Sequence, residues 1–295
     1  MVECIRKGII LAGGNGTRLA PLTSSVCKQL LPVYDKPMIY YSLATLMLSD
    51  IREILLICRP NDVDLFKNLL GNGNNWGIDI SYSVQDHPRG LADAFIIGES
   101  FIRDYNSALI LGDNLFYGNN LSKKLRDANN IKIGATIFAY QVENPSDYGV
   151  VSFRDNIVTE LEEKPQNPKS NYAVTGLYFY DQDVCELAKS LKPSKRGELE
   201  ITDLNNKYLQ IKKLNVQLIG RGNAWLDMGS YDSLIDAGQF IRTIEKRQIL
   251  KVACLEEIAW RLGWISDEDL EEQANKFSNN NYGKYLIKLL ERKIL

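Results

Sequence analysis

The chain has 295 residues, of which 45% are hydrophobic, so it is long enough to bury a core of ordinary size. Its 35 basic and 37 acidic residues are interspersed and leave a formal net charge of -2. This balance excludes the long-range field that draws a protein to nucleic acid or to an anionic membrane. Any phosphate chemistry must therefore depend on local charges.

The cysteines and apolar runs predict a reducing environment and no membrane anchor. Five cysteines are scattered along the chain, and none forms a CxxC pair. We therefore expect free thiols and neither disulfides nor structural zinc. The N-terminal MVECIRKG lacks the apolar stretch of a signal peptide, and no later run reaches the ~18 apolar residues of a membrane span. A cytoplasmic protein is expected.

Histidine occurs only once, as His87, and the chain has no GxSxG or HExxH motif. Catalysis by a Ser–His or Cys–His pair is therefore disfavoured, and so is a histidine-rich metal site.

The first 130 residues alternate between short apolar runs and helical patterns. Strands are predicted over 7–13, 53–58, 79–84 and 107–113, and helices from Pro37, over about 61–70, over 90–102 and over 120–129. Alternation of this kind, with nearly continuous apolar strands, predicts an α/β fold with a mostly parallel central sheet flanked by helices.

The pattern changes between Ile133 and Tyr180, where strands follow one another without helices. We expect strands over 133–142, 148–153, 157–164 and 171–180, which would form an inserted mixed or antiparallel layer. A helix over 197–210 and strands over 214–220 and 224–229 follow. After Ser230, apolar residues at helical spacing predict a helical C-terminal region.

Polar residues follow several of the predicted strands. They are the GGNGTR segment, Gln85, Asp113, Lys164 and Asp227. Ligands of open parallel sheets bind outside the carboxyl ends of the strands. We therefore expect all five clusters to face one crevice.

The GGNGTR segment is a glycine-rich loop that ends in Thr17 and Arg18. It fails the dinucleotide fingerprint because Leu19 replaces the last glycine, and it fails the Walker motif because none of its glycines precedes a lysine. Its backbone amides could approach phosphate oxygens, with positive charge from Arg18 and Lys28. Alone, such a loop is more often an ordinary strand–helix turn.

Asp113 and Asp227 are candidate metal ligands, because Mg²⁺ prefers one or two carboxylates together with waters and phosphates. Taken singly, an aspartate at a strand end is equally a turn former. Lys164 follows Glu162 and Glu163, which by itself is typical of a surface ion pair. Its place at a strand end makes it a candidate for holding a second, phosphorylated substrate.

Nine separated segments carry a resemblance to a known family. They are KGIILAGGNGTRLAPLT, KQLLPVYDKPMIYYSLATLM, GLADAF, LGDNLFYG, YGVV, LEEKPQNPKSNYAVTGLYFYD, RGELEITDLN, GRGNAWLDMGSYDSL and GQFI. In their order and spacing they resemble the glucose-1-phosphate thymidylyltransferases, a family of sugar nucleotidyltransferases. The resemblance runs from about Lys7 to the C-terminus.

The resemblance implies a Rossmann-like nucleotidyltransferase fold. Residues 1–230 would form the nucleotidyltransferase domain, with a mixed-sheet sugar-binding insertion at about 133–220. Residues 231–295 would form a C-terminal helical region with subunit contacts. Relatives are commonly homotetramers, so a homotetramer is expected.

The resemblance also assigns roles to individual residues. Catalysis would depend on Arg18, Lys28 and Lys164, and Mg²⁺ would bind Asp113 and Asp227. The nucleotide would contact Leu11, Gly13, Gly14, Gly16, Thr17, Gln29, Gln85 and Gly90, with the base read by Gln85 and Gly90. The sugar phosphate would contact Asn114, Tyr148, Gly149, Glu163, Val174, Tyr178 and Trp225.

The implied reaction joins dTTP and α-D-glucose 1-phosphate into dTDP-glucose and pyrophosphate, as in dTDP-rhamnose biosynthesis. UTP or another sugar 1-phosphate is an alternative, because the methyl group of thymine is worth only ~1–3 kcal/mol in a pocket. A non-catalytic nucleotide-sugar sensor would be expected to lack Arg18, Lys28 or an aspartate. A nicotinamide-dependent oxidoreductase is disfavoured by Leu19.

Three residues depart from what is common in relatives. Ala20 stands where a histidine or tyrosine is common, Asp93 replaces glutamine, and Met228 replaces threonine. None is a residue to which the resemblance assigns charge chemistry. Asp93 nevertheless changes the surroundings of the expected nucleotide site.

Overall fold

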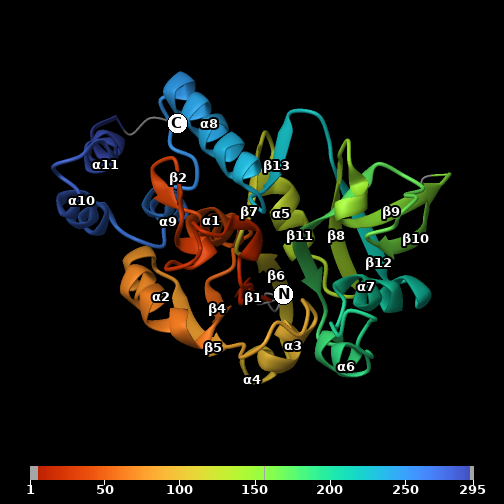
Figure 1. Ribbon diagram of the computed structural model, residues 1–295. Coiled ribbons are helices and arrows are strands. Elements are labelled where there is room, and N and C mark those ends of the chain that lie inside the picture. Colours follow the sequence, from red (N-terminus) through yellow and green to blue (C-terminus); the bar gives the residue numbers. More distant parts are fainter. Residues whose placement is uncertain (1–5, 156, 293–295) are drawn as a thin grey trace.

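Nine strands form one central sheet in the computed structural model of the chain, which describes residues 6–155 and 157–292 (Figure 1). Its parallel part has the order β6 (Asn106–Leu111), β1 (Arg6–Ala12), β4 (Glu53–Cys58) and β5 (Asp79–Val84). The first four predicted strands are therefore confirmed, and their carboxyl ends meet at one edge, as parallel pairing requires.

The strands of residues 133–220 extend this same sheet. They are β8 (Ala135–Gln141), β9 (Gly149–Arg154), β10 (Ile157–Glu163), β11 (Tyr172–Tyr180) and β12 (Leu214–Ile219). The mixed or antiparallel strands expected from the sequence are confirmed, and they belong to the central sheet itself, because β11 pairs antiparallel with β6 on one side and with β8 and β9 on the other. The nine-residue β11, nearly all buried, thereby covers what would be an open edge at β6.

Both faces of the sheet are covered, and β1 illustrates why. Its side chains alternate, so Ile10 packs into one core cluster and Ile9 and Leu11 into another. The first cluster includes residues of α1 (Ile39–Leu48), α2 (Val63–Leu70), α5 (Leu121–Asn129) and α9 (Leu255–Arg261). The second includes residues of α3 (Asp93–Ile97), α4 (Glu99–Ile102), α6 (Val184–Lys189) and α7 (Ile201–Gln210).

A second, two-stranded sheet lies beside the first. It pairs β7 (Asn114–Gly118) with β13 (Asn223–Asp227), antiparallel, with Asn114 opposite Asp227. The sequence did not predict β7, and it placed the strand ending at Asp227 with the others of the main sheet. This ribbon carries Asp227 to Asp113, the residue that precedes β7.

The C-terminal region is helical, as predicted. α8 (Tyr231–Gln248) begins with a capping box between Ser230 and Ser233, and α10 (Asp267–Lys276) and α11 (Asn281–Arg292) follow α9. In Figure 1 α10 and α11 lie on the opposite side of the molecule from β9 and β10. α8 packs over a third core cluster that includes Met38, Met228 and Ile241.

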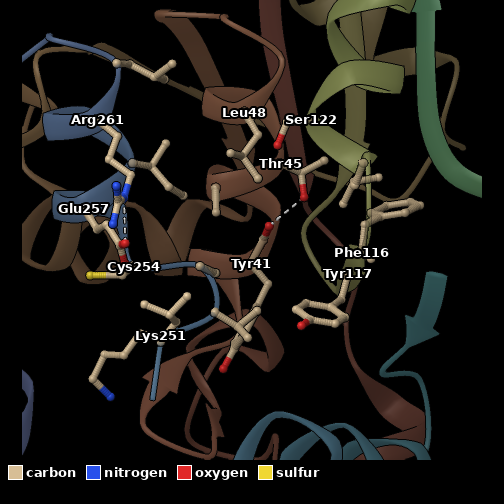
Figure 2. Close-up of a pocket in the computed structure, with 18 of the residues that line it drawn as sticks. Tyr41, Thr45, Leu48, Phe116, Tyr117, Ser122, Lys251, Cys254, Glu257 and Arg261 are labelled. Atoms are coloured by element: carbon tan, nitrogen blue, oxygen red, sulfur yellow. Dashed lines mark hydrogen bonds and ion pairs between the residues drawn. The ribbon is translucent and has the colours of Figure 1, made fainter. Parts of the chain in front are cut away.

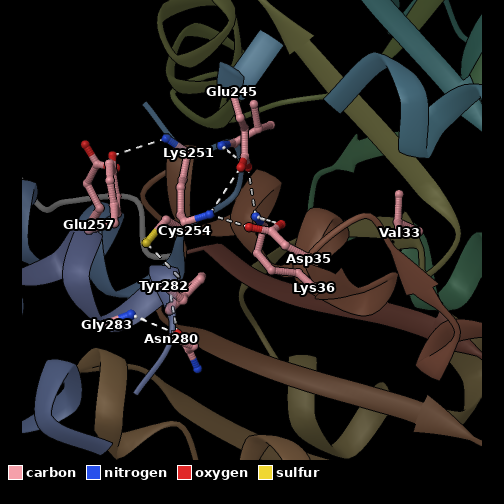
Figure 3. A network of polar contacts seen from close by, with 12 residues as sticks. Val33, Asp35, Lys36, Glu245, Lys251, Cys254, Glu257, Asn280, Tyr282 and Gly283 are labelled. Carbon is pink, nitrogen blue, oxygen red and sulfur yellow. Dashed lines mark hydrogen bonds and ion pairs between the residues drawn. The ribbon is translucent and has the colours of Figure 1, made fainter. Parts of the chain in front are cut away.

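A partly buried group of charges ties the C-terminal region to the short hairpin of β2 (Pro32–Val33) and β3 (Lys36–Pro37) (Figure 3). We call Asp35, Lys36, Glu245 and Lys251 the hairpin ion network. Lys36 contacts Asp35 and lies 3.0 Å from Glu245, while Lys251 contacts Asp35 and lies 3.2 Å from Glu245. Each carboxylate therefore meets two ammonium groups.

Two predicted helices begin or break differently in the structure. The helix over 90–102 is divided at Gly98 into α3 and α4. The helix over 197–210 begins only at Ile201, because Leu199 is held in an extended segment: its N–H donates to the Arg89 carbonyl at 2.7 Å, and its carbonyl accepts from Ala92 at 3.1 Å. These bonds join the loop after β5 to the segment that leads into α7.

The thiols of Cys27, Cys58, Cys185 and Cys254 are free and buried, while Cys4 lies outside the described residues. Within the described part of the chain, none of the helices combines the length and the apolar character that crossing a membrane requires.

Candidate active site

A cavity of about 610 Å³ opens at the carboxyl edge of the parallel strands. It is bounded by the glycine loop after β1, by Asp113 after β6, by the ends of β10 and β13 and by the start of α7. We call it the Asp113–Asp227 cavity. Of the residues that the sequence assigned to a site, those lining it are Gly14, Thr17, Arg18, Asp113, Asn114, Tyr148, Gly149, Glu163, Lys164, Val174, Tyr178, Trp225 and Asp227.

Charged groups from four separate parts of the chain act on Asp227. Burial, and next the charge of Asp113, raise the pKa of the Asp227 carboxyl to about 6, while Lys28, Arg18 and Lys164 oppose the rise. The two aspartates therefore lie together, as the strand-end argument requires, and the three predicted cations surround them. Their negative charge is only partly compensated by the protein.

Asn114 fixes the position of Asp113. Its amide Nδ2 donates to Asp113 Oδ1 at 3.0 Å, and its Oδ1 accepts from the Gly176 N–H at 3.1 Å and from Trp225 Nε1 at 2.6 Å. Lys28, which is buried, contacts the other oxygen of Asp113. One side chain thus connects β7, β11 and β13 beneath the cavity.

The glycine loop is shaped for close approach. Gly16 has a φ of 62°, in the left-handed region that favours glycine, and its carbonyl accepts from Thr23 Oγ1 at 2.9 Å. Beside the loop, a Cβ on Gly229 would lie 3.0 Å from Arg18 Nη2 and 3.3 Å from Asp227 Oδ2. A side chain at position 229 would therefore crowd both charged groups.

The side of the cavity formed by β9 to β11 has different chemistry. Glu163 Oε2 accepts from Thr202 Oγ1 at 2.5 Å, and the next residue, Lys164, leaves the strand with a φ of 44°. The rings of Tyr148 and Trp225 meet edge to face at 5.1 Å between centroids. Aromatic surface beside a carboxylate and an ammonium group suits a polar, anionic ligand such as a sugar phosphate.

Seven residues assigned to the site do not line this cavity. Leu11 and Gln29 are buried, Lys28 stands behind Asp113, and Gly16 turns the loop. Gly13 and Gln85 lie against each other, and Gly90 packs on the backbone of Leu199. The structure therefore brings Gly13 and Gln85 together across the carboxyl edge of the sheet, where β4 separates β1 from β5, and places Gly90 in the loop after β5.

Several lining residues were not predicted. Arg196, Glu198, Glu200 and Thr202 reach the cavity from the segment before and within α7. Arg196 binds Glu200 at 2.8 Å and Glu198 at 3.3 Å, and it lies 3.6 Å from Glu163. The RGELE sequence was the available signal, but a charged run at the start of a predicted helix is ordinarily solvated.

The residues present suit a hard divalent cation. Asp113 and Asp227 supply carboxylate oxygens. Burial, and next the charge of Asp113, raise the pKa of Asp227, and a bound cation would offset both effects. Among residues 6–155 and 157–292 there is no group of three or more His, Cys, Asp or Glu that could enclose a metal. A metal here would take its remaining ligands from water and substrate, which fits Mg²⁺ better than zinc.

A second cavity, of about 520 Å³, lies between α1, β7 and the segment 248–262 (Figure 2). Its lining is largely apolar and includes Tyr41, Leu48 and Phe116. Glu257 is the only acid among the described residues that line it, and its Oε1 accepts from Arg261 at 2.8 Å. It therefore lacks the pair of carboxylates found in the Asp113–Asp227 cavity.

Comparison with known proteins identifies the family. The family model for nucleotidyl transferases matches residues 7–244. A glucose-1-phosphate thymidylyltransferase of Neisseria meningitidis is 59% identical over 97% of this chain and 100% of its own length.

Solved structures show the same architecture. A crystal structure from Bacillus anthracis, described as a glucose-1-phosphate thymidylyltransferase in complex with sucrose, has a TM-score of 0.75 and 40% identity over 80% of this chain and 95% of its own. A UDP-glucose pyrophosphorylase bound to UDP-glucose has a TM-score of 0.69 and 26% identity over 81% of this chain and 99% of its own. The chain belongs to the nucleotidyl transferase family.

Proposed function

We propose that this protein transfers a thymidylyl group from dTTP to α-D-glucose 1-phosphate, with Mg²⁺, and releases dTDP-glucose and pyrophosphate. The observation that carries the proposal is the convergence of Asp113 and Asp227 with Arg18 and Lys164 on one cavity, with Lys28 bound to Asp113 behind it. Two relatives named glucose-1-phosphate thymidylyltransferase, which are 59% and 56% identical to this chain, support the choice of nucleotide and sugar.

In the proposed reaction, a phosphate oxygen of glucose 1-phosphate attacks the α-phosphorus of dTTP. The new P–O bond forms as the bond between the α-phosphorus and the bridging oxygen breaks, and pyrophosphate leaves with that electron pair. The attacking group is already an anion, so no protein base is needed. This is consistent with a cavity that contains no histidine among its lining residues.

The work of the protein is to bring two anions together and to stabilise developing charge. Arg18 and the glycine loop would hold the triphosphate, and Lys164 would hold the sugar-borne phosphate. Glu163 and Tyr148 would contact the sugar. Asp113 and Asp227 would hold Mg²⁺, which when bound supplies positive charge beside the α-phosphate. The family is generally metal-dependent, and magnesium is our specific proposal.

The direct test is to incubate the purified protein with dTTP, glucose 1-phosphate and MgCl₂ and to identify the products by chromatography. We expect dTDP-glucose and pyrophosphate in equal amounts, and loss of both when EDTA is added. Pyrophosphate without a sugar nucleotide, or no reaction with any nucleoside triphosphate, would overturn the proposal.

A UTP-dependent reaction is the second candidate, favoured by the similarity to a UDP-glucose pyrophosphorylase. One methyl group separates thymine from uracil, so the protein could use both. Competition between dTTP and UTP for limiting glucose 1-phosphate distinguishes these cases, since the ratio of products reports the ratio of kcat/KM values.

We further propose a homotetramer in the cytoplasm, with a catalytic domain over 1–230, a sugar-binding insertion at about 133–220 and subunit contacts from 231–295. Exposed apolar side chains of α8 and the following loop, including Ile235, Ile249 and Leu250, support an interface there. Light scattering on the full chain tests the proposal, and a monomer would contradict it.

A further inference from the structure

The expected base-reading residue, Gln85, is held by an unusual partner. Its amide Nε2 donates to Asp93 Oδ2 at 2.9 Å, and both side chains are almost fully buried, with 4% and 2% of their surfaces exposed. Arg89 Nε approaches the same carboxylate oxygen at 3.3 Å, from a side chain that is largely exposed. Position 93 is one of the departures found in the sequence.

The chemistry of Asp93 determines which way the amide points. A carboxylate only accepts hydrogen bonds, so it must face the NH₂ of Gln85 and never its oxygen. An uncharged amide at position 93 could face either end, because it both donates and accepts. Asp93 therefore removes the ambiguity between the two flips of the Gln85 side chain.

The opposite end of that amide faces the glycine loop. A Cβ on Gly13 would lie only 2.4 Å from Gln85 Oε1, so the oxygen rests directly against the loop that follows β1. No residue in the described part of the chain donates a hydrogen bond to Oε1. The site thus presents one carboxamide oxygen with unused accepting capacity.

The pyrimidine bases differ in what they offer to such an oxygen. Thymine and uracil carry a donor at N3–H beside an acceptor at O4, whereas cytosine carries an acceptor at N3 beside a donor at N4. A carboxamide can pair with either edge, but only in opposite orientations. An orientation fixed in advance therefore discriminates between the two edges.

We infer that Asp93 is a positioning residue for base specificity: by locking the Gln85 amide, it selects pyrimidines with an N3–H group and rejects cytosine. The inference rests on the proposed function, since it takes Gln85 to contact the base. It goes beyond that function by naming a residue outside the expected contacts and the class of nucleotide that it excludes.

The test compares dTTP with dCTP in the wild type and in Asp93→Asn, which has nearly the same shape but can face either end of the amide. We expect the ratio of kcat/KM values for dTTP and dCTP to fall about tenfold in the variant, mainly through KM. Arg89→Ala is the matched control, because it removes the ion pair and leaves the carboxylate. Its ratio should stay at the wild-type value.

Calorimetric binding of dTDP and dCDP supplies a readout that does not depend on turnover. A purely structural role for Asp93 would weaken both ligands equally and leave their ratio unchanged, and this result would overturn the inference. If Asp93→Asn does not fold, Asp93→Ser provides the same comparison, since it removes the carboxylate and leaves a hydroxyl group that both donates and accepts hydrogen bonds.

Failure of the inference and failure of the proposed function give different results. A wild type that makes dTDP-glucose but whose dTTP preference survives in Asp93→Asn refutes the inference alone. A wild type that prefers dTDP to dCDP in binding, loses this preference in Asp93→Asn and yet transfers no thymidylyl group refutes the function and supports the inference.

Discussion

Two clusters of charge in this molecule are built in opposite ways. In the hairpin ion network, burial would raise the pKa of Asp35, but Lys36 and Lys251 outweigh burial and lower it. In the Asp113–Asp227 cavity, burial and a neighbouring carboxylate raise the pKa of Asp227. In the hairpin ion network, the carboxylates are compensated by the ammonium groups of the protein. The carboxylates of the Asp113–Asp227 cavity are only partly compensated, and a bound ligand would supply the missing positive charge. Incomplete compensation of this kind is typical of a functional site.

Asp113 and Asp227 should respond differently when each is changed separately. Asp227→Asn should lower kcat/KM by about 100- to 1,000-fold, because one of the two proposed metal ligands is lost. It should also raise the melting temperature, since it removes a destabilising buried charge. Steady-state kinetics and calorimetry measure both. Unchanged Mg²⁺-dependent turnover would contradict the metal assignment.

Asp113→Asn is the matched control for that experiment. It should lose activity to a similar degree, but it leaves the buried ammonium of Lys28 without its carboxylate. We therefore expect a lower melting temperature, at a cost of about 3 kcal/mol. Equal shifts in the melting temperatures of the two variants would show that the charges around Asp113 and Asp227 are not arranged as described.

A substitution in the hairpin ion network should lower the stability of the protein and leave catalysis unchanged. Glu245→Gln removes a buried carboxylate that meets Lys36, Lys251 and the N–H of Val252. We expect the free energy of unfolding to fall by about 3 kcal/mol, measured in urea, while kcat at low temperature stays unchanged. Glu53→Gln, in a half-exposed pair with Lys7, is the control and should have little effect.

Within the Asp113–Asp227 cavity, Lys164→Ala should change the KM values of the two substrates to different degrees. Because Lys164 follows β10 on the side of Glu163, we expect the KM for glucose 1-phosphate to rise about 10- to 100-fold, with the KM for dTTP nearly unchanged. Initial rates over a grid of both substrates provide these values. A rise confined to the KM for dTTP would reverse the proposed division of the site.

The smallest predicted effect is a dependence of stability on pH. The pKa of Asp227 is about 6 in the folded protein, above the ordinary aspartate value of 3.8. The folded state therefore binds a proton more tightly, so the free energy of unfolding falls as pH rises between these two values. Between pH 4.5 and 7 we expect about 1–2 kcal/mol from this group, absent in Asp227→Asn. An identical pH slope in both proteins would refute the raised pKa.

The local patterns of the sequence were sufficient to predict the parallel strands of the central sheet. Continuous apolar strands such as β1 and β4, each followed by a helix, specify a covered parallel sheet, and strand ends then mark one edge. Arg18 and Asp113 could be predicted to meet for this reason. The period and spacing of apolar residues in strands and helices involve only residues that are near one another in the chain, so they can be read directly from the sequence.

Tertiary structure alone decided which distant strands pair and which charges are compensated. The joining of β11 to β6, the β7–β13 ribbon that brings Asp227 to Asp113, and the approach of Arg196 to Glu163 all depend on contacts between residues far apart in the chain. The bond from Gln85 to Asp93 spans only eight residues, but its meaning depends on burial and on Gly13. The burial and the electrostatic compensation of a charged group depend on all the atoms that surround it in the folded protein. These surroundings cannot be read from the order of residues in the chain.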